Sequence, residues 1–377
     1  MRLPGRTIVR SVRRWPARIA GIDAAAATPI VRTQEEPLFK TLTRTLILAT
    51  AAVSLAGAAN AKDYSFKFQS SDAAGSPNFA LQKDWAKNVK KSTDGQVTIN
   101  LLPVDSIVSH SETQDAIQAG ILDGHITDVS YFSGKDPAFG LIANPVGAWS
   151  DPQNMLDFMS HQGGKLMTEL DSQYGLHFIG ATTPGLEALV SKVPLNGVAD
   201  LKGVKIRAPE GLVQNVFAAA GAAPVNLPQS EIYTSLDKGV IDAADATVFS
   251  TNQELGLNTI APNPVYPGFH SLPLVEIAMN KKEWDDLPEK LQTTLTKSVH
   301  QFAQHELSVL QKRDQEAVEK AKATGKIHIH DWSDAERAKF RKIAEGEWKK
   351  VATKSDNAQK VYDTLTSYLK EKGLLKE

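Results

Sequence analysis

The chain of 377 residues contains no cysteine. Without thiols it can form no disulfide, no cysteine-ligated zinc site and no cysteine nucleophile. The sequence also lacks a Gly-x-Ser-x-Gly nucleophile elbow, a His-Glu-x-x-His zinc motif and a phosphate-binding glycine loop. These absences argue against the common exported hydrolases, although a catalytic triad can be assembled from distant residues. We therefore expect no enzymatic activity, no cofactor and no metal.

Basic stripes and long apolar runs are also missing. The net charge is −1, but residues 1–61 carry nine basic and only three acidic residues, which leaves residues 62–377 with an acidic excess. An acidic body argues against nucleic acid as a partner. The apolar run at 46–59 has about 14 residues, fewer than the roughly 20 that span a bilayer. We expect no membrane insertion once this run is removed.

The run at 46–59 has the features of a secretory signal. Lys40 and Arg44 precede it, and Ala59-Asn60-Ala61 closes it with the small residues of a signal-peptidase site. We expect residues 1–61 to be a leader that is cleaved after Ala61, which places the mature protein in the periplasm of a Gram-negative bacterium. A buried helix is the alternative for this run. Because residues 1–37 are too long for a signal's charged region, we expect that translation begins later, near Val31 or Leu38.

From residue 62 onward, strand and helix patterns alternate. Residues 64–69 alternate aromatic and polar side chains, and Ser76-Pro77 is a typical helix start. Further strands are expected at 97–101, 126–131, 186–191, 203–207, 223–226, 241–247 and 326–330, and a long helix at about 289–323. The segment 176–180 is apolar. This order predicts an α/β fold with parallel sheets and right-handed crossovers. In such sheets ligands bind beyond the carboxyl ends of the strands.

Several segments of this part of the chain resemble a known family. They are Asp200–Pro209, Ala223–Pro228 with Glu231–Leu236, Gly239–Ala243, Ala119–Asp123 and Ala278–Trp284. Together, in their order along the chain, these segments resemble the solute-binding proteins of tripartite ATP-independent periplasmic (TRAP) transporters, the DctP-like family. The resemblance covers essentially all of residues 62–377.

The resemblance implies a periplasmic-binding-protein-like fold. Two α/β lobes, joined by crossing strands and a long helix, are expected to close on a ligand. Lobe I is expected at 62–184 and 273–312, and lobe II at 185–272 and 313–377. The resemblance also implies delivery of the ligand to the membrane subunits of a TRAP permease.

Arg207 is the central candidate for ligand binding. It ends a predicted strand and matches the family's carboxylate-binding arginine. A guanidinium suits this role because it offers a paired donor fork and stays charged. The alternative is a surface arginine in an ion pair. Asn226 matches a polar position that touches ligands in the family, with capping of the following turn as the alternative.

Two acidic residues depart from the family pattern. Glu187 stands near a position where relatives carry arginine or glutamine. Asp245 stands where keto-acid-binding relatives carry glutamate, and Ala246 replaces the adjacent tryptophan. The loss of that tryptophan argues against a metal-bridged ligand. Two acids in one cleft would suit an ammonium group or sugar hydroxyls, and peripheral ion pairing is the alternative.

Aromatic residues and one histidine complete the candidate site. Tyr131, Phe132, Trp149 and Phe249 are candidates for an apolar wall, with core packing as the alternative for Trp149 and Phe249. His270 lies at the expected crossing between the lobes, where it would donate to a ligand or serve the structure. The predicted function is a receptor for a small organic acid, such as a sugar, keto or hydroxy acid. A receptor for an amine or zwitterion, an exported hydrolase and a sensory ligand carrier are the alternatives.

Overall fold

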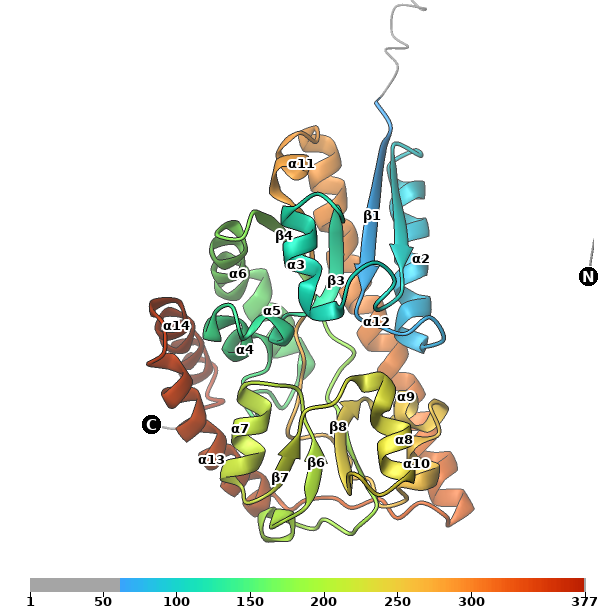
Figure 1. Ribbon diagram of the computed structural model, residues 1–377, viewed down its shortest axis with the longest axis vertical. Helices are drawn as coiled ribbons and strands as arrows, with labels where there is room; N and C mark the ends of the chain where they lie inside the picture. The colour runs from blue at the N-terminus through green and yellow to red at the C-terminus, as the bar shows by residue number, and fades with distance from the viewer. Residues whose placement is uncertain (1–61, 376–377) are drawn as a thin grey trace, which may run out of the picture. The chain divides into compact units, whose positions relative to one another are not determined.

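The computed structural model describes residues 62–375, and the predicted leader at 1–61 lies outside them (Figure 1). The described chain contains two β-sheets. The strands are β1 (Tyr64–Ser70), β2 (Val97–Leu102), β3 (Gly124–Asp128), β4 (Leu176–Thr182), β5 (Ala188–Ser191), β6 (Lys205–Arg207), β7 (Ala223–Val225), β8 (Ala243–Thr247) and β9 (Val275–Asn280).

Helices precede, follow and connect these strands. The α-helices are α2 (Pro77–Ser92), α3 (Thr113–Gln118), α4 (Pro137–Ala143), α5 (Pro152–Ser160), α6 (Gln162–Ser172), α7 (Leu212–Ala219), α8 (Ile232–Asp237), α9 (Phe249–Glu254), α10 (Leu257–Ile260), α11 (Lys281–Asp285), α12 (Glu289–Thr324), α13 (Asp334–Ala352) and α14 (Asp356–Glu371). Short 3-10 helices are η1 (His110–Glu112), η2 (Val129–Phe132), η3 (Val198–Leu201) and η4 (Gln229–Glu231). Among the described helices, none is both long and apolar enough to cross a bilayer.

The first sheet has the strand order β2-β1-β3-β9-β4. Strands β1, β2 and β3 are parallel, as predicted, whereas β9 pairs antiparallel with both β3 and β4. The sheets are therefore mixed rather than purely parallel. Helix α2 covers β2 and begins as expected, with the Ser76 side chain accepting a hydrogen bond from the Phe79 amide and Pro77 in the first turn. Its Trp85 packs on Phe302 of α12 within one apolar core.

The second sheet has the order β5-β8-β6-β7. Strand β6 is parallel to β7 and β8, and β5 is antiparallel to β8. Helix α7 packs beside β7, while α8, α9 and α10 lie against β8 and β5. The parallel strands β6 and β8 are neighbours (Figure 1). Arg207, the last residue of β6, lies opposite Ala244, and β8 continues to Thr247.

The chain crosses between the two sheets twice, from β4 to β5 and from the segment after α10 to β9. The two crossing segments are bonded to each other, because the Glu187 amide donates to the Ser271 carbonyl at 3.0 Å. The 36-residue helix α12 contacts α2 and β4 on the first lobe and α9 on the second. Two α/β lobes, two crossings and a shared long helix confirm the predicted fold class.

The lobe boundaries stay a prediction, and the contacts of the last two helices bear on them. Helix α14 packs on α4 and α6, which belong to the expected range of lobe I. Helix α13 contacts α7 of the second lobe as well as α4. The C-terminal helices therefore touch both lobes, although residues 313–377 were expected in lobe II.

The strand predicted at 326–330 is absent from the described chain. Instead, this extended segment makes a single bridge between His330 and Val265. The amides of His328 and His330 donate to the carbonyl oxygens of Pro262 and Pro264. Because prolines have no amide hydrogen to donate in return, a full ladder cannot form here.

Candidate functional site

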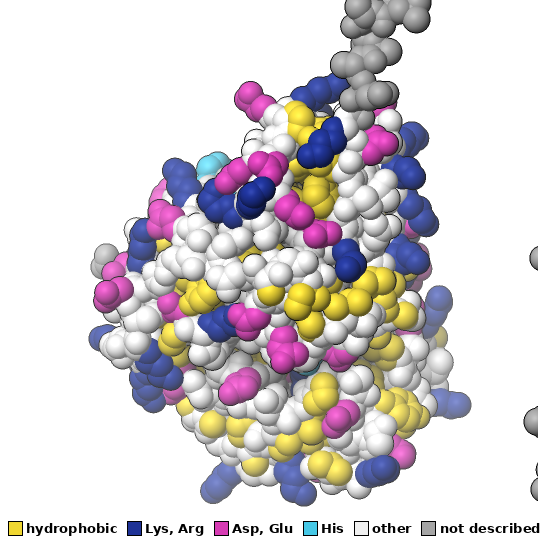
Figure 2. Space-filling model, turned by 45° about the horizontal axis from the view of Figure 1, so that its top comes forward, with side chains coloured by type: hydrophobic (Ala, Val, Ile, Leu, Met, Phe, Trp, Pro, Cys, Tyr) yellow, Lys and Arg dark blue, Asp and Glu magenta, His cyan; other side chains and the backbone are white. Residues whose placement is uncertain are grey.

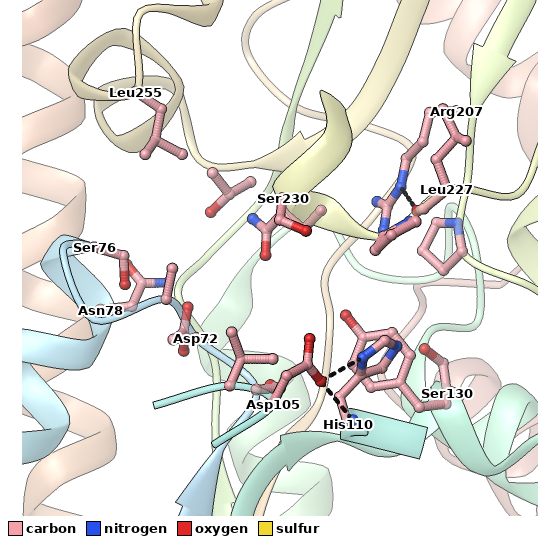
Figure 3. Close-up of a pocket in the computed structure, with 18 of the residues that line it drawn as sticks. Asp72, Ser76, Asn78, Asp105, His110, Ser130, Arg207, Leu227, Ser230 and Leu255 are labelled. Atoms are coloured by element: carbon pink, nitrogen blue, oxygen red, sulfur yellow. Dashed lines mark hydrogen bonds and ion pairs between the residues drawn. The ribbon is translucent and has the colours of Figure 1, made fainter. Parts of the chain in front are cut away.

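A cavity of about 380 Å³ lies between the two lobes (Figure 3). The first lobe contributes the loop after β1, the start of α2, and residues 104–111 and 130–131. The second lobe contributes Arg207 at the end of β6, the loop after β7 and Thr247 at the end of β8. A smaller hollow of about 60 Å³ shares Arg207 and Thr247 with this cavity and reaches Asp128 and Glu187. We call the two hollows together the cleft.

Arg207 is held rigidly on the second-lobe side of the cleft. The side chain is only 4 % exposed. Its Nε donates to the carbonyl oxygen of Leu227 at 3.0 Å, and its Nη1 donates to the carbonyl oxygen of Asp245 at 2.7 Å. Neutral carbonyls fix the guanidinium without cancelling its charge. The remaining N–H groups and the positive charge are therefore suited to an anionic ligand.

Asp245 and His270 form a buried pair behind Arg207. The His270 Nε2 lies 3.0 Å from the Asp245 Oδ1, and both side chains are fully buried. Burial alone would raise the pKa of Asp245, but His270, Glu187 and Arg207 together hold it below its usual range. Neither Asp245 nor His270 lines the cleft. Their contribution is to position the main chain that anchors Arg207.

Glu187 lies at the deep end of the cleft, where the chain crosses between the lobes. Its carboxylate accepts a hydrogen bond from the Ser271 hydroxyl, which in turn accepts from the Asn144 amide at 2.7 Å. The side chain is buried, and burial together with the negative charge of Asp245 raises its pKa well above the usual range. Glu187 thus joins the crossing segments to the binding cleft.

Asp72 and Asp128 are two further acids of the cleft, at the ends of β1 and β3. Burial raises the pKa of each to about 6, partly offset by hydrogen bonds from the Gln82 side chain to Asp72 and from the Ser130 main-chain amide to Asp128. Tyr131 lies among them, and its pKa is raised by burial and by the charge of Asp128. The first-lobe side is therefore rich in acceptors.

The structure places the other predicted residues in two groups. Asn226 lines the cleft from an exposed position, with its Nδ2 3.5 Å from Glu210 Oε2, and Tyr131 lines it from the first lobe. Phe132, Trp149 and Phe249 are core residues and do not line the cleft. Their aromatic neighbours in the core are Phe139 for Phe132, Phe158 and Tyr368 for Trp149, and Tyr266 for Phe249. This placement corrects the expectation that these three side chains form its apolar wall, which comes instead from Leu227, Leu255 and Leu257.

Sequence reasoning missed Asp72, Asn78, Asp128 and Thr247. Asp72, Asp128 and Thr247 stand at or just beyond the carboxyl ends of β1, β3 and β8. The rule that ligands bind at these ends therefore contained the signal. Asn78 stands in the first turn of α2, and nothing in its sequence surroundings marks it out.

Glu187, Asp245 and His270 are also a set of metal-ligand type. Each offers one ligand atom, and the three atoms lie within 4.8 Å of one another. In the structure, however, His270 pairs with Asp245 and Ser271 donates to Glu187. The Oδ2 of Asp245 and the Nδ1 of His270 have no hydrogen-bond partner among the described residues.

Comparison with known proteins gives a consistent result. Residues 68–355 match the model of the bacterial extracellular solute-binding proteins, family 7 (DctP). A TRAP periplasmic solute-binding protein from Rhodobacter sphaeroides, solved in an apo open form, is 66% identical. That match covers 83% of this chain and 100% of the other, with a TM-score of 0.71.

Two more distant relatives have named ligands. The monocarboxylate 2-oxoacid-binding periplasmic protein of Nostoc is 32% identical over 55% of this chain and 57% of its own length. A TRAP solute-binding protein from Bordetella bronchiseptica, solved with calcium and picolinate, is 20% identical, with 83% and 93% of the two chains covered and a TM-score of 0.76.

Proposed function

Because the chain belongs to the bacterial extracellular solute-binding proteins of family 7, the DctP family of TRAP transporters, we propose that it binds a small organic acid in the cleft and delivers it to a TRAP permease. The observation that carries this proposal is the buried Arg207, which lines a cavity of ligand size and has no direct bond to a carboxylate among residues 62–375. A carboxylate is the natural partner of such a guanidinium.

The proposed mechanism is capture between two lobes. Arg207 and Thr247 belong to the second lobe, whereas Asp72, Asn78 and Tyr131 belong to the first. A ligand that touches both walls favours the closed arrangement, because it binds that arrangement better than an open one. The crossing segments joined by Glu187 and Ser271 are the hinge in this proposal.

The named ligands of relatives support the choice of a carboxylate. The Nostoc protein is named for 2-oxoacids, and the Bordetella structure contains picolinate with calcium. Relatives are named as periplasmic proteins. We extend that location to this chain, and we propose that residues 1–61 direct its export and that a permease receives the ligand.

A thermal-shift screen of the mature chain tests the proposed ligand class. Keto, hydroxy and sugar acids are compared with the matching neutral alcohols, and a carboxylate at 100 times its dissociation constant adds about 2.7 kcal/mol of stability. Mass spectrometry of the recovered ligand then separates a receptor, which returns it unchanged, from a hydrolase. Stabilisation by neutral alcohols but by no acid contradicts the proposal.

A further inference from the structure

Acidic side chains outnumber basic ones in the lining of the cleft, which does not suit a purely anionic ligand. Among the described lining residues, five carry carboxyl groups, against one guanidinium and no lysine: Asp72, Asp105, Asp128, Glu187 and Glu210. The raised pKa of Glu187 favours its neutral form, and the other four acids still outnumber Arg207. Asp105 has a partner in His110, whose Nδ1 lies 3.4 Å from its Oδ1. Figure 2 shows acidic and basic side chains interspersed over one face of the molecule.

The two walls of the cleft differ in hydrogen-bonding character. On the second-lobe wall Arg207 is the charged donor, and Glu210 is the only carboxylate there apart from Glu187 at the crossing, among the described lining residues. On the first-lobe wall Asp72 and the Oδ1 of Asn78 are acceptors (Figure 3), and Asp128 adds a third. Asn78 Oδ1 is buried without a hydrogen-bond partner among the described residues, and the side chain is 7 % exposed. A buried acceptor without a donor is costly, and a ligand donor would relieve that cost.

Two hydroxyl groups of the cleft are also buried without a hydrogen-bond partner among the described residues. The Ser130 Oγ and the Thr247 Oγ1 are buried without partners within the described chain, on side chains that are 5 % and 3 % exposed. They belong to opposite lobes and line the same cavity. The unsatisfied polar atoms are therefore distributed around the place where a ligand would sit.

From these observations we propose that the ligand is a small zwitterion, with its carboxylate on Arg207 and a cationic nitrogen on the acceptor wall formed by Asp72, Asn78 and Asp128. The inference rests on the proposed function and narrows its substrate class. A cationic nitrogen supplies both N–H donors and the positive charge that the acidic wall lacks. A purely anionic ligand would add negative charge beside Asp128, which already lies close enough to Arg207 and Asp245 for their charges to affect it.

Matched sets of three compounds test this inference. Each set contains an amino acid, the acid without its nitrogen and the amine without its carboxylate. Suitable sets are proline, cyclopentanecarboxylate and pyrrolidine; 4-aminobutyrate, butyrate and propylamine; and β-alanine, propionate and ethylamine. The mature chain is treated with a chelator, and binding is followed by thermal shift and calorimetry, with and without added calcium.

We expect an amino acid to bind at least tenfold more tightly than both of its partners. Asp128→Asn should weaken binding of the amino acid about tenfold and should not weaken binding of the matched acid, because it removes a negative charge beside the carboxylate. Asp84→Asn, on the exposed face of α2, should change neither affinity. The inference is overturned if the matched acid binds as tightly as the amino acid, or if the matched acid binds only when calcium is added. In both of these cases the proposed function stands. The inference is also overturned if no set contains an amino acid that binds. Binding of an amine without any need for a carboxylate overturns both.

Discussion

The Nη1 of Arg207 donates to the main-chain carbonyl oxygen of Asp245 at 2.7 Å, while the side chain of Asp245 pairs with His270 on the other side. The main chain of Asp245 thus anchors the cation of the cleft, while one oxygen of its carboxylate is bound to His270 in the protein core. Arg207 keeps its positive charge available to a ligand because its fixed partners are neutral carbonyl groups.

Asp245 has two separate roles: its main-chain carbonyl holds Arg207, and its side chain pairs with His270. Asp245→Asn keeps the main-chain carbonyl that holds Arg207 but disturbs the buried pair with His270. We expect the free energy of unfolding to fall by about 1–3 kcal/mol, the range for a disrupted buried hydrogen bond. Ligand affinity should fall by less than about tenfold. Denaturant unfolding and calorimetry measure the two effects, with Asp237→Asn on the exposed face of α8 as the control. A large loss of affinity with unchanged stability would place the carboxylate itself on the ligand.

Gly268 is a position where the crossing segments require a glycine. A Cβ at this residue would collide with the main-chain carbonyl oxygen of Glu187. Gly268→Ala should therefore lower the free energy of unfolding by about 2–3 kcal/mol, as overpacking against backbone does. Gly346→Ala is the matched control, since an added Cβ on helix α13 meets nothing within 4 Å and should stabilise by about 0.5–1 kcal/mol. Equal effects of the two substitutions would contradict this explanation.

Stability should also depend on pH through a cluster in the first lobe. Glu276 lies 2.9 Å from the buried His125, and burial raises its pKa from 4.5 to about 8. The pKa of His125 falls to about 4, so the histidine is neutral at pH 7. The folded state therefore keeps a proton on Glu276 that the unfolded chain releases above its own, lower pKa. The resulting stability is lost as the pH rises toward 8.

The corresponding measurement is denaturant unfolding of the wild type and of Glu276→Gln between pH 6 and pH 8. The wild type should lose about 2 kcal/mol over this range, since each unit of pH below a raised pKa changes stability by about 1.4 kcal/mol. Glu276→Gln, which imitates the protonated acid, should have a flatter profile. Parallel profiles would show that Glu276 does not carry the proton.

The sequence predicts strand ends better than it predicts where side chains point. Arg207 and Asn226 end or follow strands, and both line the cleft. By contrast, an aromatic residue after a strand has the same local pattern whether it faces a cavity or the core, and Phe132 and Phe249 face the core. Long-range packing decides between the two directions.

The acids of the first-lobe wall show the opposite case, in which residues that the sequence does not mark out line the cleft. Asp72 and Asp128 are ordinary turn residues in sequence, and only the parallel pairing of β1 with β3 brings their strand ends to one edge. Whether an acid in a turn lines a cleft depends on how the other lobe packs against it. A single sequence does not contain that information.

The most direct test of the account is calorimetry of the mature chain and two Arg207 variants with whichever carboxylate the screen identifies. Arg207→Ala should lower affinity by roughly two to four decades, because removing one partner of a buried ion pair costs about 3–5 kcal/mol. Arg207→Lys should fall in between, since it keeps the charge but not the paired fork. Arg313→Ala, which removes a half-exposed arginine 3.8 Å from Glu254 and outside the cleft, should have no effect on affinity. An unchanged dissociation constant in a folded Arg207→Ala protein would mean that the carboxylate binds elsewhere.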